Sequence, residues 1–259
     1  MSHLHVPDGI LPLWLILVGW LATVLMLAVA MHALRGRERA RTVPQIGIVS
    51  ALLIAAMSTE IVPIAYHANL TVLAGIILGP AGGVVAAFAV NLILALFGHG
   101  GITVVGLNTV VIGSETVLGY VLFYLFVRLL PRHVGVAAGM ATVITLFLST
   151  SLSIGIIALS QINPAEARDM GSLNPHTLSF SNPFKEGVLA NRIVTPEQEG
   201  GASSTLSLKR FAEAMYALGA IGWTLESLLT GFLVSFVARV RPSLLRQPIL
   251  GAALAGGDG

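Results

Sequence analysis

The sequence predicts an all-α protein, a polytopic bundle of transmembrane helices. Of its 259 residues, 55% are hydrophobic and only 10% are charged. A soluble domain carries about 25% charged residues, so this chain cannot cover a water-facing surface and lipid must surround most of it. Long apolar runs and short arginine clusters between them complete the pattern of a multi-pass inner-membrane protein.

Six apolar runs are about as long as the 20 residues that a helix needs to cross a bilayer core. They are Leu11–Leu34, Ile46–Pro63, Asn69–Phe97, Val104–Val127, Val134–Ile162 and Phe211–Ala238. The third run contains Gly79-Pro80-Ala81-Gly82-Gly83, which is a strong helix-breaking signal. A break there gives a short helix over about Tyr66–Leu78 and a second over Val84–Phe97, hence seven spans; without it there are six.

The arginine clusters indicate whether the chain has six or seven spans. They follow the first span (Arg35, Arg37, Arg39 and Arg41), the Val104–Val127 span (Arg128 and Arg132) and the last span (Arg239, Arg241 and Arg246). Cytoplasmic loops are rich in arginine and lysine, and all three clusters face inward only if the third run is two helices. We therefore predict about seven spans, with the N-terminus outside and the C-terminus inside.

This topology gives one transmembrane domain over residues 1–259, with an N-terminal segment (1–10) and a long loop (161–209) on the outer face. The loop is polar and holds four prolines. His3, His5, His67, His99 and His176 then lie outside, whereas His32 and His133 lie at the inner face. The net charge of +2 reflects these orientation signals, and we expect no nucleic-acid partner.

Several classes of chemistry are excluded by what is missing. The chain has no cysteine, so a transition-metal site must use nitrogen or oxygen ligands. It has no P-loop, no His-Glu-x-x-His motif and no Gly-x-Ser-x-Gly motif. We expect a protein that is not an enzyme and holds no cofactor.

The N-terminal segment carries the first candidate ligands. His3 and His5 lie close to a free α-amine, and an amine, a backbone amide and an imidazole together favour square-planar Ni²⁺ or Cu²⁺. Pro7 and the Asp8-Gly9 turn signal allow the segment to fold over the bundle and cap a metal. The alternative is a frayed tail with incidental histidines.

His67 and His99 are the other candidates. We expect His67 at the start of the short third helix, where it is either a ligand or an interfacial capping residue. His99 lies among three glycines in Phe97-Gly98-His99-Gly100-Gly101, which allow close backbone approach to a ligand or form an exposed turn.

Polar residues within the spans are expected to have structural roles. Glu115 and Glu226 cannot face lipid cheaply, so they pair, bond to backbone or line a path. Asn91 and Asn108 are expected to form hydrogen bonds between helices.

Four segments together resemble the CbiM/NikM family, the substrate-capture components of energy-coupling-factor (ECF) importers for cobalt and nickel. They are His5-Val6-Pro7-Asp8-Gly9-Ile10-Leu11, His67-Ala68-Asn69-Leu70 through Gly79-Pro80, Phe97 to Asn108 with its glycine-rich turn, and Ile221 to Gly231 with Glu226. The resemblance covers almost the whole chain except the 161–209 loop.

The resemblance implies that the chain binds Ni²⁺ or Co²⁺ through an N-terminal amine, the following amide, and the imidazoles of His5 and His67. It implies supporting roles for Asp8, Asn69, Asn108 and Glu226. The implied partners are a transmembrane coupling subunit, cytoplasmic ATPase subunits and a small accessory membrane subunit, and imported cobalt would serve cobalamin biosynthesis.

The chain departs from the family pattern in two places. Three residues precede Leu4-His5, where the family begins Met-His, and three explanations are open. Leu4 is the true start, or Ser2-His3 supplies the ligands after removal of Met1. In the third, the extension is real and His3 binds the metal together with His5 and His67. The glycine turn has His99 where the family has aspartate, and Ser227 follows Glu226 where the family has glycine.

Two other functions stay open from the residues alone. A stand-alone divalent cation permease or channel needs a polar row through the membrane, and the sequence offers only isolated polar residues at depth. A capture subunit for a vitamin is the third interpretation, which the histidines disfavour.

Overall fold

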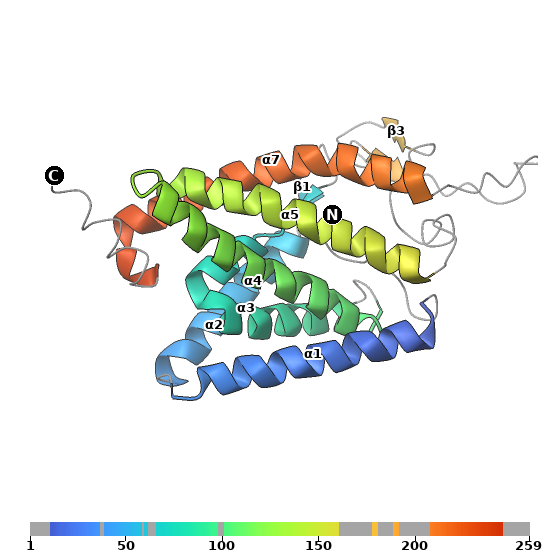
Figure 1. Cartoon of the computed structure of the whole chain (residues 1–259), viewed down its shortest axis with the longest axis horizontal. Coiled ribbons are helices and arrows are strands. Elements are labelled where there is room, and N and C mark those ends of the chain that lie inside the picture. Colours follow the sequence, from blue (N-terminus) through green and yellow to red (C-terminus); the bar gives the residue numbers. More distant parts are fainter. Residues whose placement is uncertain are drawn as a thin grey trace, which may run out of the picture.

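The computed structural model describes residues 11–36, 39–58, 60–61, 66–97, 101–160, 178–180, 189–191 and 208–245. Within these ranges six helices are long and apolar enough to cross a membrane, and they lie side by side in a bundle (Figure 1). They are α1 (Leu13–Leu34), α2 (Arg39–Ser58), α3 (Thr71–Leu96), α4 (Val105–Leu129), α5 (Val134–Ser160) and α7 (Leu208–Val240). The predicted fold class, a multi-pass helical membrane protein, is confirmed.

Short elements join the helices. Strands β1 (Glu60–Ile61) and β2 (Tyr66–His67) pair antiparallel between α2 and α3, and β3 (Leu178–Phe180) pairs with β4 (Leu189–Asn191) in the long connection before α7. A 3₁₀ helix, η2 (Pro242–Leu244), follows α7. The sequence predicted neither strand pair, because segments of two or three residues carry no periodicity.

Helix α3 is the central element, and it is broken where the sequence predicts. Gly79 has φ 73° and ψ 174°, which only glycine adopts readily, and Pro80 follows it. Gly75 and Gly83, on either side of the break, both lie against Thr116 of α4. In a straight helix these glycines would be about 12 Å apart, so the chain bends sharply at Gly79.

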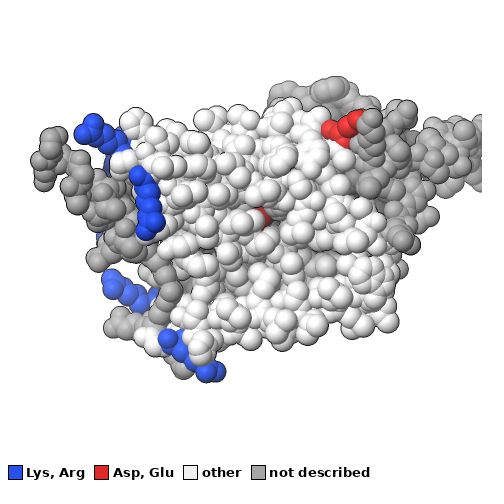
Figure 2. Space-filling model, in the orientation of Figure 1, with Lys and Arg blue, Asp and Glu red and all other residues white. Residues whose placement is uncertain are grey.

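The described arginines of the three clusters gather at one end of the bundle, where α1, α4 and α7 finish (Figure 2). This is the arrangement that the positive-inside argument required, and the bend in α3 reconciles it with six long helices. The number of crossings and the direction of insertion stay predictions.

The start of α1 is anchored at the opposite end of the bundle. Leu11 and Leu15 are buried against Val104, Leu107 and Ile156, which come from the start of α4 and the end of α5. Trp20 Nε1 also donates a hydrogen bond to the Thr103 carbonyl oxygen at 3.0 Å. These contacts fix the position of Leu11, the residue that follows the N-terminal segment.

Candidate functional site

A cluster of buried polar side chains lies at the junction of α3, α4, α5 and α7. Its members are Glu115 and Glu226, which are 0% and 1% exposed, together with Asn69, Thr71 and Ser149. An ionised group at membrane depth is costly unless hydrogen bonds compensate for its lost hydration. The hydrogen bonds of each carboxylate therefore show which segments of the chain the cluster holds together.

Glu115 of α4 ties together the start of α3 and the middle of α5. Its Oε2 accepts hydrogen bonds from Asn69 Nδ2 at 2.5 Å and from Thr71 Oγ1 at 2.6 Å. Its Oε1 accepts a hydrogen bond from Ser149 Oγ. Three donors from two other elements thus hold this carboxylate in place.

Glu226 of α7 binds backbone instead of side chains. Its Oε1 accepts the Leu70 N–H at 2.8 Å and its Oε2 accepts the Asn69 N–H at 3.3 Å. These two N–H groups precede the first turn of α3, where no helical partner exists for them. Glu226 therefore supplies the acceptors that buried, non-helical backbone requires inside a membrane protein.

The segment that these carboxylates hold is strained. Leu70 has φ 50° and ψ 14°, a left-handed conformation that is uncommon for a residue other than glycine. Such a conformation costs about 1–3 kcal/mol and persists where its surroundings determine it. Here the bond to Glu226 and the burial of the Leu70 side chain provide that constraint.

The candidate ligand His67 is two residues before this anchored segment. The structure corrects its expected place, because His67 lies in β2 and the helix begins only at Thr71. Glu226 binds the N–H groups of Asn69 and Leu70, and Leu70 is left-handed, so the right-handed helix does not extend back to His67. In the β1–β2 pair, Glu60 is the residue opposite His67.

The structure does not describe the other histidines of the outer face or Asp8. His3, His5, Asp8, His99 and His176 lie outside the described residues, as does the His67 side chain. His32 is exposed in the last turn of α1, and His133 is exposed in the turn between α4 and α5, both at the arginine-rich end. Within the described ranges no group of three or more histidine, aspartate or glutamate residues could hold a metal.

Of the predicted supporting residues, Asn69 and Glu226 meet at the cluster, and Asn108 is buried in the first turn of α4. Thr71 and Ser149 were missed. Nothing in the sequence separates these two hydroxyls from the many other serines and threonines of the spans, and only the packing of α5 on α4 brings Ser149 to Glu115.

Comparison with known proteins shows the family to which this chain belongs. Residues 5–244 match the family CbiM, described as a cobalt uptake substrate-specific transmembrane region. The chain belongs to the CbiM family. The match begins at His5 and covers the buried cluster, so the predicted resemblance is confirmed over nearly the whole chain.

Individual relatives agree with membership of CbiM. A protein of Haloquadratum walsbyi (strain DSM 16790 / HBSQ001), whose name assigns it to metal transport, is 34% identical over 157 residues, which are 59% of this chain and 72% of the relative. A crystal structure of a transition metal transporter has the same fold, with a TM-score of 0.64 and 20% identity over 98% of this chain and 99% of the other. A truncated transition metal transporter gives a TM-score of 0.63 and 19% identity over 91% and 98% of the two chains.

Family and helical fold together make this CbiM protein a multi-pass membrane component of metal uptake.

Proposed function

We propose that the chain is the substrate-capture subunit of an ECF-type importer and binds Ni²⁺ or Co²⁺ at the outer face of the cell membrane. The metal is held by the N-terminal segment, 1–10, through His5 and a main-chain amine and amide, and by His67. His3 is an additional ligand if the N-terminal extension is retained, and His99 is a weaker candidate.

The observation that carries this proposal is the anchoring of the segment just after His67. Discontinuous helices with satisfied, non-helical backbone at depth mark substrate sites in membrane transporters. Glu226 and Glu115 hold Asn69 and Leu70 from two different helices, so the backbone that leads to His67 has little freedom. A ligand held on such a support loses little entropy when metal binds.

The buried carboxylates themselves are supports rather than ligands. Every oxygen of Glu115 and Glu226 already accepts a hydrogen bond from the protein. A metal bound there would compete with those donors for the carboxylate charge and weaken the bonds that satisfy buried N–H groups. The chemistry of nitrogen ligands on the outer face is therefore the better match to the family's metals.

The importer requires further subunits, because the sequence offers no nucleotide-binding motif. We infer a transmembrane coupling subunit, a cytoplasmic ATPase pair and a small accessory membrane subunit. Imported cobalt would then supply cobalamin biosynthesis.

Calorimetric titration of Ni²⁺, Co²⁺ and a vitamin panel onto the purified protein tests the site. The wild type should bind one of the two metals and no vitamin, and His67→Ala should weaken that binding at least 100-fold. His133→Ala is the matched control, because His133 is exposed beside the arginine-rich turn, and it should bind as the wild type does. Equal metal binding by wild type and His67→Ala would rule out the site.

Two further measurements refine the proposal. Intact mass identifies the first residue of the mature chain and thus distinguishes the ligand sets that begin at Met1, Ser2 and Leu4. Metal uptake into liposomes that contain only this chain would favour the permease interpretation, whereas the capture-subunit proposal predicts no uptake without the ATPases.

A further inference from the structure

A groove of about 1050 Å³ runs between α5 and α7 on the outside of the bundle. It lies outside the buried carboxylate cluster, and no part of the proposed metal site uses it. Its floor is formed by small residues at which the two helices approach closely. A β-carbon added at Gly231 would lie 2.8 Å from the Gly135 carbonyl oxygen, and one added at Gly139 would lie 3.2 Å from the Ser227 carbonyl oxygen.

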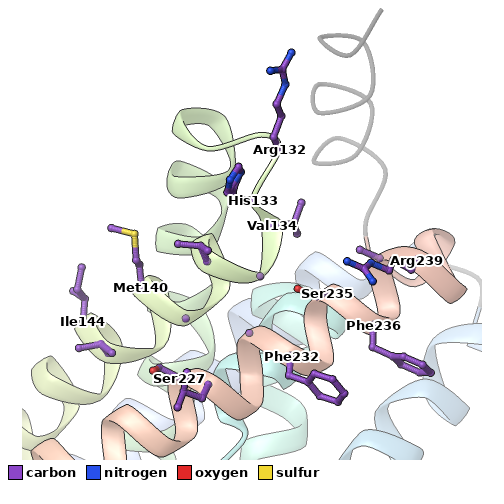
Figure 3. Close-up of a pocket in the computed structure, with 17 residues that line it drawn as sticks. Arg132, His133, Val134, Met140, Ile144, Ser227, Phe232, Ser235, Phe236 and Arg239 are labelled. Atoms are coloured by element: carbon purple, nitrogen blue, oxygen red, sulfur yellow. The ribbon is translucent and has the colours of Figure 1, made fainter.

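The walls of the groove are apolar and exposed. Val136 and Met140 rise from α5 and are 54% and 41% exposed, and Phe232 and Phe236 rise from α7 and are 68% and 55% exposed. Small residues below and large residues on either side therefore create a channel open to the surrounding hydrocarbon (Figure 3). In a membrane such a channel is filled by an acyl chain or by another helix.

One end of the groove is basic. Arg132, His133 and Arg239 are exposed and line this end of the groove, Arg132 and His133 at the start of α5 and Arg239 on α7, while Met140 and Ile144 continue along α5 away from it (Figure 3). None of the described residues that line the groove is acidic. Helix α5 also begins at Val134, so the positive end of its dipole and its unbonded first-turn amides lie beside the two arginines.

The dimensions fit one leaflet of a bilayer. From Val134 to Ile144 on α5 the helix advances by ten residues, or about 15 Å, and from Arg239 to Ser227 on α7 it advances by twelve residues, or about 18 Å. Half of a bilayer core is about 15 Å thick. A headgroup beside the arginines therefore places an acyl chain along the full length of the groove.

We propose that this groove binds an anionic phospholipid. The phosphate lies at the end of the groove that Arg132 and Arg239 line, and one acyl chain lies between Met140 and Phe232. Basic pockets between transmembrane helices are suited to such headgroups, and the charge of the rim favours this occupant over an apolar helix of a partner subunit, which would leave both arginines without a counter-charge.

The test compares lipids on the full-length protein in detergent. Native mass spectrometry should show phosphatidylglycerol or cardiolipin retained in preference to phosphatidylcholine. In the double variant Arg132→Gln/Arg239→Gln, the affinity for phosphatidylglycerol should fall about 30-fold, which corresponds to about 2 kcal/mol for two surface charges. Arg35→Gln/Arg41→Gln removes two exposed arginines from the same end of the bundle without changing the groove, and it should retain the lipid.

Three results of the lipid comparison would overturn the proposal. They are equal retention of anionic and zwitterionic lipid by the wild type, an unchanged preference in Arg132→Gln/Arg239→Gln, and an equal loss in both double variants, which would reveal general attraction to the basic end. Inorganic phosphate supplied at the same concentration should not displace the lipid, because the acyl chain contributes to binding; displacement would show a phosphate site instead. Nickel and cobalt titration of the same variants should be unchanged, so this proposal and the proposed metal site fail separately.

Discussion

At the scale of single residues, the two buried glutamates bind different kinds of hydrogen-bond donor. Glu115 accepts hydrogen bonds from side chains at the start of α3 and on α5. Glu226 accepts hydrogen bonds from the main-chain N–H groups of Asn69 and Leu70. Both are fixed in the interior, at 0% and 1% exposure, where the low local dielectric makes each bond costly to lose. The polar residues of this membrane protein thus determine the path of the backbone next to His67.

Glu226→Ala should destabilise the protein and weaken metal binding together. The substitution leaves two buried N–H groups without an acceptor, at about 1–3 kcal/mol for each group. We expect a lower midpoint of thermal unfolding in detergent and at least a tenfold loss of metal affinity in calorimetry.

Ser227→Ala serves as the control for Glu226→Ala, because the Ser227 hydroxyl bonds only to the carbonyl of Thr224 in its own helix among the bonds described. It should change neither quantity. Wild-type affinity and stability in Glu226→Ala would contradict the anchoring role.

At the scale of elements, α3 owes its shape to one residue. The bend at Gly79 lets helical segments on both sides lie against Thr116 of α4. Gly75 and Gly83 make this possible because a side chain at either position would meet Thr116; at Gly83 an added β-carbon would lie 2.7 Å from the Thr116 Cβ. The motif that predicted a break is therefore also the motif that packs the core.

Gly79→Ala should destabilise this element. Its φ of 73° and ψ of 174° belong to a region that residues with a β-carbon avoid, at about 1–3 kcal/mol. Thermal unfolding should show a clearly lower midpoint than for the wild type.

Gly47→Ala is the matched control in a neighbouring helix, since an added β-carbon there meets nothing within 4 Å. Alanine is the better helix former, so this variant should be equal to the wild type or slightly more stable. A Gly79→Ala protein as stable as Gly47→Ala would show that the bend does not depend on glycine.

At the scale of the whole molecule, charge and hydrophobicity are separated along the bundle. Among the described side chains, those of arginine lie at one end (Figure 2), and the start of α1 is anchored at the other. The positive-inside rule then predicts that the arginine-rich end is cytoplasmic and that the 161–209 loop is external.

Single cysteines can test this orientation, because the chain has none of its own. In intact cells, a membrane-impermeant maleimide should label Ser203→Cys in the long loop. It should not label Pro131→Cys, which is exposed in the turn between α4 and α5, until the cells are opened. The reverse pattern would invert the topology and move the proposed metal site to the inner face.

The sequence by itself determined the class of the protein and its principal elements. Low charge and long apolar runs predicted the membrane bundle, Gly79-Pro80 predicted the break in α3, and the segments around His5 and Glu226 predicted the family. These signals are local or compositional, so they can be read along the chain.

Only the tertiary structure decided which polar residues meet. Asn69 and Glu226 are 157 positions apart, and Glu115 and Ser149 are 34 apart; no periodicity relates such pairs. The same packing placed His67 in a strand rather than a helix, because Glu226 binds the N–H groups of Asn69 and Leu70 and Leu70 is left-handed. Long-range hydrogen bonds between buried groups thus overrode the local apolar pattern that had predicted a helix from Tyr66.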